Sequence, residues 1–318
     1  MKEDVPARYL IDGFYQVPPG TSEHYIDEVL RVVEKERIDV ILPLADPELG
    51  PLAKNMKSFA ASGCKVCISD YAAISIAGDC SKLYSLFSGE DFVPEFRIPA
   101  DWEDLESKIK ELGFPRNRVV IKPFSSHGSI GLRVIDNESN LFDLYMNVKP
   151  DSTFTNKSIL METLKGRVIE NLILTQYLPG KEYGVDLLID PRTNKVISGI
   201  VRDNGEVELS GISRGELVTD QRLFATAKYV AEKLKLSYAV NIDFKLDENS
   251  KPKMLEINPR LPATCYLATA AGLNLPLLSV YLALGREFET PKIKPGLRIY
   301  SYRGFIVVGD DNEISCVV

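Results

Sequence analysis

The sequence contains no run of about 20 apolar residues, the length that a helix needs to cross a bilayer. Its opening residues, MKEDVPARYLIDGFY, hold no apolar segment of the kind found in a secretory leader. Cysteine is scarce, with five among 318 residues. An odd number of cysteines without a leader predicts reduced thiols and a cytoplasmic location, and the missing apolar runs predict no membrane partner.

Several catalytic patterns are also missing. No G-x-G-x-x-G follows an early strand, and no G-x-x-x-x-G-K-[ST] occurs, which disfavours a dinucleotide-binding dehydrogenase and a P-loop enzyme. No Ser-His-Asp or Cys-His pattern indicates a protein nucleophile. The net charge of -7 predicts no nucleic-acid partner, because phosphate backbones bind basic surfaces. A small anionic ligand is still compatible with this charge, since it needs only local positive charge.

Two of the cysteines, Cys64 and Cys67, form a C-x-x-C pair in the segment CKVCISD. Such a pair can bind zinc or act as a redox centre, but a second pair that would complete a zinc site is missing. The segment also has the pattern of a buried strand. This pattern favours two unreactive core thiols over a metal or redox site.

Helical and strand patterns alternate through residues 1–89. Residues 23–37 place apolar side chains on one helical face, and short apolar strands follow at 38–44 and 65–69. This alternation predicts a parallel α/β lobe. A complete lobe of this type would open with a strand and a glycine turn, so we expect this one to be incomplete.

From about residue 90 the pattern changes to mixed strands and helices, which predicts α+β architecture. We expect a small lobe at 90–180, a large lobe at 181–290 and a terminal strand or tail at 291–318. Within the large lobe, strands are predicted at 183–189, 195–202, 238–246 and 253–258, with helices at 219–235 and 264–285.

The strongest chemical signal lies in residues 238–260, YAVNIDFKLDENSKPKMLEINPR, where two strands flank a polar turn. Side chains two residues apart share a face of a strand, so Asp243, Glu256 and Asn258 can share one face of the hairpin. The simplest register sets Asp243 opposite Glu256, and such like charges repel. A divalent cation would reverse the repulsion, and carboxylate and amide oxygens suit Mg²⁺. The alternative is a solvated hairpin face with incidental acids.

With its motif Glu256-Ile257-Asn258-Pro259-Arg260, this hairpin resembles the metal hairpin of ATP-grasp enzymes, in particular the carbamoyl-phosphate-synthase-like group. The resemblance implies that Asp243, Glu256 and Asn258 hold Mg²⁺, or Mn²⁺ in its place. It also implies that Arg260 contacts the transferring phosphate or the substrate carboxylate. Asn241 matches a family position beside the metals.

A second signal is VVIKPFSSHGSIGLRVI, in which a strand ends at Lys122 and a glycine-bearing loop follows. Glycines let the backbone approach a phosphate closely. Alone, the pattern is equally typical of an ordinary hairpin. It is similar to the lid loop of ATP-grasp enzymes, which implies that Lys122 meets the α-phosphate and stabilises charge during transfer. Gly128, Ser129 and Gly131 match lid positions that close over the β- and γ-phosphates.

A third signal is LILTQYLPGKEYGVDLL, where a strand runs into a turn and a new strand starts at Glu182. The resemblance implies that Gln176, Tyr177 and Leu178 form the adenine linker and that Glu182 binds the ribose hydroxyls. By itself, Glu182 is more typical of an exposed acid at the start of a strand.

Three further basic residues match the family less closely. Lys82, in DCSKLYSLF, resembles a residue that contacts phosphates from the first lobe. Arg214 resembles a catalytic arginine near the γ-phosphate, as does Arg202 in the same segment. A solvent-exposed lysine and surface salt bridges are the competing interpretations.

The motifs follow one another in the family order, and the resemblance covers almost the whole chain. It implies an ATP-grasp fold, with a partial N-terminal lobe and two α+β lobes that enclose the nucleotide. The implied activity is that of a Mg-ATP-dependent carboxylate–amine ligase, which forms an acyl phosphate and then an amide or peptide bond. Small-molecule carboxylates and amines are the implied partners, and a homodimer is the implied assembly.

Two alternative functions are open. A kinase or a bicarbonate-activating synthase would use the same nucleotide site. A non-catalytic nucleotide sensor belongs to another class, and the intact set of metal ligands disfavours it. After the NPR motif the chain reads LPAT where many relatives carry glycine or serine, so the identity of the substrates is not predicted.

Overall fold

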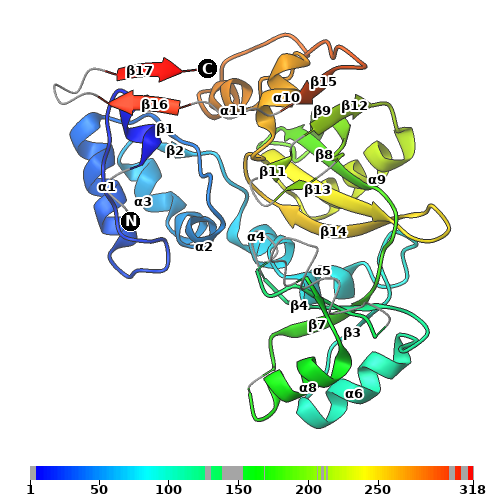
Figure 1. The fold of residues 1–318 in the computed structure, drawn as a ribbon. Helices are drawn as coiled ribbons and strands as arrows, with labels where there is room; N and C mark the ends of the chain where they lie inside the picture. The colour runs from blue at the N-terminus through cyan, green and yellow to red at the C-terminus, as the bar shows by residue number, and fades with distance from the viewer. Residues whose placement is uncertain are drawn as a thin grey trace. The chain divides into compact units, whose positions relative to one another are not determined.

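The computed structural model describes residues 5–125, 130–137, 153–167, 169–205, 207–208, 211–212, 214–300, 305–308 and 314–317. The chain divides into two compact units (Figure 1). The first unit comprises Met1–Ile74, Tyr183–Asn241 and Asn258–Val318, and the second comprises Ser75–Glu182 and Ile242–Ile257. Within the described ranges, no helix combines the length and the apolar character that a membrane span requires.

The first unit opens with a small α/β lobe. Its strands β1 (Val40–Ile41) and β2 (Lys65–Val66) pair in parallel, as the alternating pattern predicts. Leu52, Phe59 and Val66 belong to its hydrophobic core. The helices of this part are η1 (Pro6–Tyr9), α1 (Tyr25–Glu36), α2 (Asp46–Lys54), α3 (Met56–Ala61) and α4 (Tyr71–Ala77), the last of which leads into the second unit.

The larger part of the first unit is an antiparallel sheet with helices packed against it. Strands β8 (Glu182–Ile189), β9 (Val196–Asp203), β12 (Arg214–Val218) and β15 (Arg298–Tyr300) pair in that order. Leu188, Ile200 and Leu217 of these strands form one core with Ala268 and Leu275 of the helices. The helices are α9 (Gln221–Lys233), α10 (Cys265–Ala270) and α11 (Leu275–Ala283).

Strands β13 (Tyr238–Leu246) and β14 (Pro252–Asn258) run from one unit into the other. The strand order of their sheet is β14-β13-β8-β9-β12-β15. Ile242 and Phe244 of β13 are buried, whereas Asp243 and Lys245 between and after them are partly exposed, as the alternation in the sequence predicts. Two short antiparallel pairs complete the first unit: β10 (Val207–Glu208) with β11 (Gly211–Ile212), and β16 (Phe305–Val308) with β17 (Ile314–Val317).

The second unit contains a five-stranded sheet of order β3-β7-β4-β5-β6, in which β5 and β6 are parallel and the other pairs antiparallel. Its strands are β3 (Phe96–Arg97), β4 (Val119–Pro123), β5 (Arg133–Ile135), β6 (Phe154–Thr155) and β7 (Leu172–Gln176), and its helices are α5 (Cys80–Leu86), α6 (Trp102–Glu111) and α8 (Lys157–Leu164).

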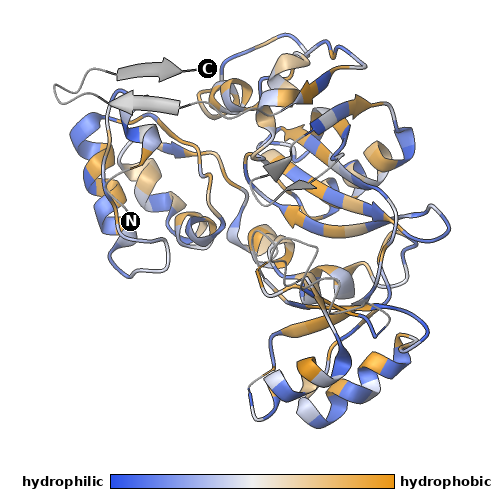
Figure 2. Cartoon of the chain, viewed as in Figure 1, coloured by the Kyte–Doolittle hydropathy of each residue, from blue (hydrophilic) through white to orange (hydrophobic). Residues whose placement is uncertain are grey.

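Helices α6 and α8 pack on the sheet of the second unit through their apolar faces. Asp101 caps α6 by accepting from the N–H of Asp104, and Asn156 caps α8 in the same way. Leu105 of α6 and Leu160 of α8 belong to the core that this sheet helps to form. Both helices keep hydrophilic residues on their other faces (Figure 2).

The predicted elements are present, and the structure divides some of them and adds others. Between the two strands of the N-terminal lobe the chain forms two helices, α2 and α3, separated at Asn55, whose side chain donates to the carbonyl of Pro51. The helices predicted at 264–285 are α10 and α11, separated near Gly272, which has a φ of 102°. The last predicted strand is two strands, β15 and β16, and β12 was not predicted because five residues show too little alternation.

Candidate active site

A cavity of about 390 Å³ opens in the second unit. Ile121 of β4 points into the core, whereas Val120 and Lys122 line the cavity, because the side-chain period of a strand is two. Val134 of β5 and Thr175 of β7 are the cross-strand partners of Val120, so they share its face and line the cavity as well. One face of the sheet therefore builds the core, and the other builds a space of the size that small-molecule sites have.

Seven of the residues that the sequence predicts for the site line this cavity. They are Lys122, Gln176, Tyr177, Leu178, Glu182, Asp243 and Glu256.

Lys122 places a buried ammonium group in the cavity wall, with 7% of the residue exposed. Its Nζ donates to the carbonyl oxygen of Leu255 at 3.2 Å and to Oη of Tyr84 at 3.4 Å. Burial opposes the charge, but Tyr84, Cys80 and Glu256 outweigh that effect and hold the pKa of Lys122 above its usual value. A buried cation held by neutral oxygens is well suited to an anionic ligand.

The two carboxylates predicted as metal ligands reach one space, since Asp243 of β13 and Glu256 of β14 both line the cavity. Carboxylates that share a cavity repel each other unless a cation offsets their charge. Among the described residues, no cluster of three or more His, Cys, Asp or Glu is arranged to hold a metal. The third predicted ligand, Asn258, is not among the described residues that line the cavity, and the metal site stays a prediction.

The predicted adenine linker, Gln176–Leu178, forms another part of the wall. The side-chain Oε1 of Gln176 accepts from the backbone N–H of Glu95 at 2.7 Å. The backbone N–H of Gln176 donates to the backbone carbonyl of Glu95 at 2.9 Å. This side chain therefore ties the end of β7 to the segment before β3. The contact between adenine and the backbone of Tyr177 and Leu178 stays a prediction.

Arg118, which the sequence reasoning missed, supports the same wall from outside. Its guanidinium carbon lies 5.4 Å from the ring centroid of Tyr177 and 5.7 Å from that of Phe154, and both rings line the cavity. Its Nε lies 2.8 Å from Oδ2 of Asp136, whose side chain is 3% exposed. Phe154 lies in β6, Asp136 directly follows β5 and Tyr177 directly follows β7, so no local sequence pattern could have found these partners.

Glu182, predicted as the ribose ligand, lies at the start of β8 with Oε2 3.8 Å from Nζ of Lys245. Lys245 is the second residue that the sequence reasoning missed. It lies two positions after Asp243 on β13, and the alternation that placed Asp243 on the polar face could have identified it. The described residues of the lining thus include two cations and three carboxylates.

Gly131 has a φ of 83°, and a Cβ on it would lie 2.8 Å from Cγ of Pro123. This position of the predicted lid loop therefore favours glycine. Gly128 and Ser129, the other predicted lid residues, lie outside the described residues.

Lys82 and Arg214 lie on exposed surfaces. The side chain of Lys82 is 57% exposed, with Nζ 3.3 Å from Oδ2 of Asp79. That of Arg214 is 51% exposed, with Nη2 3.8 Å from Oε2 of Glu216 on the same strand. Neither residue lines the cavity, so surface ion pairs account for their positions and their predicted roles stay predictions.

In the first unit, Arg260, Asn258 and Asn241 form one polar chain. Arg260 contacts Oδ1 of Asn258 through Nη2 at 3.1 Å, and Asn258 donates from Nδ2 to Oδ1 of Asn241 at 3.0 Å. Arg260 also pairs with Asp46 of α2. Arg202 is not at a surface: it is 4% exposed and pairs with buried Asp186.

Cys64 and Cys67 are buried free thiols. Burial raises the pKa of Cys67 to about 12, and the neighbouring Cys64 contributes a smaller effect in the same direction. Both thiols therefore stay protonated at neutral pH, which fits unreactive core residues.

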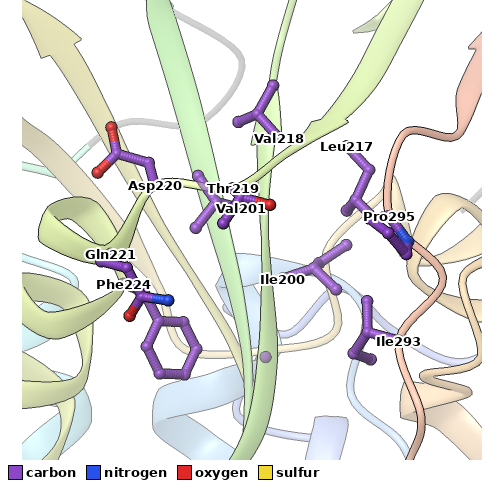
Figure 3. Close-up of a pocket in the computed structure, with 11 residues that line it drawn as sticks. Ile200, Val201, Leu217, Val218, Thr219, Asp220, Gln221, Phe224, Ile293 and Pro295 are labelled. Carbon is purple, nitrogen blue, oxygen red and sulfur yellow. The ribbon is translucent and has the colours of Figure 1, made fainter.

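A second cavity, of about 260 Å³, lies in the first unit between β9, β12 and the start of α9 (Figure 3). Its lining is mostly aliphatic, with Ile200 and Ile293 near its centre and the ring of Phe224 at one side. Asp220, the main charged group, already caps α9 through the N–H groups of Arg222 and Leu223. No sequence-predicted site residue lines this cavity, so the chemistry points to the cavity of the second unit.

Two family models match parts of the chain. Residues 168–305 match the model described as ATP-grasp in the biosynthetic pathway with Ter operon. Residues 1–67 match the PylC-like N-terminal domain.

Curated relatives include the large chains of two carbamoyl phosphate synthases. The one from Methanobrevibacter smithii is 24% identical over 281 residues, which cover 83% of this chain and 25% of that protein. The one from Methanothermobacter thermautotrophicus is 23% identical over 279 residues, covering 82% of this chain and 24% of that protein. The chain therefore spans about a quarter of the length of these relatives.

Solved structures share the fold at low identity. A biotin carboxylase from Campylobacter jejuni, in complex with β-γ-ATP, has a TM-score of 0.65 and 20% identity, covering 86% of this chain and 61% of that one. N5-carboxyaminoimidazole synthetase from Staphylococcus aureus, complexed with ADP, has a TM-score of 0.61 and 17% identity, covering 92% and 71%. With the family models, these likenesses confirm the predicted fold.

Proposed function

Since this chain is an ATP-grasp protein, we propose that it is an enzyme that binds Mg-ATP, phosphorylates a carboxylate and joins the acyl phosphate to an amine. The observation that carries the proposal is the cavity of the second unit, which the buried ammonium group of Lys122 lines together with Asp243 and Glu256.

The lining of this cavity fits a nucleoside triphosphate and a divalent cation. Val134 and Leu178 offer apolar surface to a base, and Glu182 offers a hydrogen-bond acceptor to the ribose hydroxyls. Lys122 offers a buried cation to the phosphates. Asp243 and Glu256 offer the hard oxygen ligands that Mg²⁺ prefers, with Asn258 as the further predicted ligand.

In the proposed reaction, an oxygen of the carboxylate substrate forms a bond to the γ-phosphorus, and the bond from that phosphorus to the β–γ bridging oxygen breaks to release ADP. The amine then attacks the acyl carbon, inorganic phosphate leaves and the amine loses a proton. Lys122 and Arg260 stabilise negative charge on the transferring group or on the substrate carboxylate. A bound Mg²⁺ would neutralise charge on the phosphates. Assembly as a homodimer stays a prediction.

The test measures ADP release by the 318-residue chain with Mg-ATP and a panel of carboxylates, bicarbonate included, each with and without a panel of amines. For the carboxylate that drives turnover, Glu256→Gln is expected to lower the rate about 100-fold, because it removes one charged ligand. The matched control is Glu248→Gln in the exposed turn between β13 and β14, which should keep the wild-type rate.

The product separates the possible activities. ADP, phosphate and an amide formed in equal amounts support the ligase. A stable phosphorylated product indicates a kinase, and turnover with bicarbonate alone indicates a bicarbonate-activating synthase. Nucleotide binding without turnover for any substrate would indicate a sensor and overturn the proposal, as would a wild-type rate in Glu256→Gln.

A further inference from the structure

Four buried or half-buried polar side chains lie in a row along four neighbouring strands of the sheet. In the strand order β14-β13-β8-β9 they are Asn258, Asn241, Asp186 and Arg202. All four belong to the first unit. Nδ2 of Asn258 donates to Oδ1 of Asn241 at 3.0 Å, and Nδ2 of Asn241 donates to Oδ1 of Asp186 at 3.0 Å. Nε of Arg202 lies 3.2 Å from Oδ2 of Asp186.

The buried end of this row is rigidly built. Asp186 is fully buried and Arg202 is 4% exposed, so their ion pair has little contact with water. Arg202 lies opposite Gly184 in the register, and a Cβ on Gly184 would lie 2.4 Å from Cζ of Arg202. The missing side chain of Gly184 is therefore what leaves room for the guanidinium group to reach Asp186.

The chemistry of the row permits one orientation of its two amides. A carboxylate paired with arginine accepts hydrogen bonds and donates none, so Asn241 must turn its NH₂ group toward Asp186. The oxygen of Asn241 then points the other way and can accept from Asn258 but not donate to it. Asn258 must therefore donate from its NH₂ group to Asn241, and its oxygen points away from the row. On that side the oxygen of Asn258 accepts from Nη2 of Arg260 at 3.1 Å.

This orientation matters because a cation binds the oxygen of an amide and not its nitrogen. We propose that Asp186, held by Arg202, is a positioning residue that acts through Asn241 to fix the amide of Asn258 with its oxygen presented to the metal. The inference rests on the proposed function, in which Asn258 is a metal ligand. Hydrogen-bonding partners behind a ligand commonly determine its orientation and its affinity for the metal.

The test compares Asp186→Asn with the double variant Asp186→Asn/Asn241→Asp in the full chain. An asparagine at 186 can turn either its oxygen or its nitrogen toward Asn241. The amide orientations of Asn241 and Asn258 are then no longer fixed. In the double variant the carboxylate moves to position 241, where it accepts from both neighbours and again forces the NH₂ group of Asn258 inward. Mn²⁺ serves as the probe, and its binding is followed by electron paramagnetic resonance in the presence of ADP.

Asp186→Asn is expected to weaken Mn²⁺ binding about tenfold or more, and the double variant is expected to recover most of that loss. The control is Asp190→Asn at the end of β8, which removes a carboxylate that accepts from the N–H of Arg192 outside the row and should leave Mn²⁺ affinity unchanged. A purely structural role for Asp186 would lower stability in both variants without this recovery. Wild-type affinity in folded Asp186→Asn, or a double variant as weak as the single one, would overturn the inference.

If Asp186→Asn does not fold, Asn241→Leu replaces it. That variant keeps the pair of Asp186 and Arg202 but removes the acceptor for Asn258, and it should weaken Mn²⁺ binding to the same degree; wild-type affinity would overturn the inference. Glu256→Gln separates the two proposals. If it binds Mn²⁺ as the wild type does, the metal site itself is wrong. If it loses Mn²⁺ while Asp186→Asn and Asn241→Leu retain it, the inference alone fails.

Discussion

Asp46 and Arg260 form a bidentate ion pair. Nε of Arg260 lies 2.7 Å from Oδ1 of Asp46, and Nη2 lies 3.0 Å from Oδ2. Asp46 starts α2 in the N-terminal lobe, and Arg260 directly follows the Asn258-Pro259 dipeptide after β14. The pair shows that Arg260 is oriented to hold a carboxylate through two parallel hydrogen bonds, the geometry that arginine offers to carboxylate and phosphate groups.

Replacing Asp46 with asparagine is expected to lower the free energy of unfolding by about 1–2 kcal/mol. The side chains of Arg260 and Asp46 are 16% and 30% exposed, so solvent screens the pair only in part. The variant also removes a negative charge from the first turn of α2. Urea unfolding measures the change. Asp27→Asn changes an exposed acid in the first turn of α1 and is the control for the interaction of a carboxylate with the helix dipole. An equal loss of unfolding free energy in both variants would contradict a stabilising ion pair.

Gly131→Ala is expected to destabilise the chain more than Gly166→Ala, by about 1 kcal/mol or more. Both glycines have positive φ, 83° and 68°, so both variants carry the backbone cost. A Cβ at 131 would also lie 2.8 Å from the Pro123 ring, whereas no atom of the residues that the structure describes lies within 4 Å of a Cβ at 166. Thermal or urea unfolding of the two variants gives the difference. A difference near zero would show that Pro123 moves aside at no cost.

Local patterns explain which parts of the site could be predicted. Lys122, Asp243 and Glu256 lie on strands whose alternation is visible in the sequence, and the cavity lining includes all three. The pair of Asp46 and Arg260 joins residues 214 positions apart. Arg118, Asp136 and Tyr177 each lie next to the end of a different strand, β4, β5 and β7. Such contacts depend on the order of strands in a sheet. No window of sequence encodes that order, so the partners of a predicted residue emerged only from the fold.

The stability of the chain is expected to fall at high pH in a way that depends on Cys67. Burial raises the pKa of Cys67 to about 12, so the folded state favours the neutral thiol. A folded-state pKa above the unfolded value stabilises the fold below the unfolded value, near pH 9, and this contribution is lost as the pH rises toward 12. In Cys67→Ala the free energy of unfolding should therefore fall less steeply between about pH 9 and 11 than in the wild type.

Urea unfolding of both proteins at several pH values measures these slopes, and taking their difference removes the contributions of tyrosines and lysines that titrate in the same range. Cys265→Ala provides the comparison at a thiol that is only partly buried. Parallel slopes for wild type and Cys67→Ala would show that the thiol ionises in the folded state without a penalty.

Arg118→Met is expected to weaken nucleotide binding several-fold and to lower the free energy of unfolding by about 1–2 kcal/mol. The substitution removes the cation that stacks on Tyr177 and Phe154 in the cavity wall, and it takes the arginine partner from buried Asp136. Calorimetric titration with Mg-ADP and urea unfolding measure the two effects. Arg116→Met, an exposed neighbour, is the control for loss of charge near the cavity.

Adding Asp136→Asn to Arg118→Met separates the two effects, because a neutral amide costs less to bury than a carboxylate that has lost its arginine. The double variant should recover much of the stability but not the nucleotide affinity, since the rings of Tyr177 and Phe154 still lack the guanidinium group behind them. Recovery of both would mean that the ion pair alone shapes the wall. Wild-type affinity for Mg-ADP in the single variant would show that the stacking of Arg118 contributes nothing to the site.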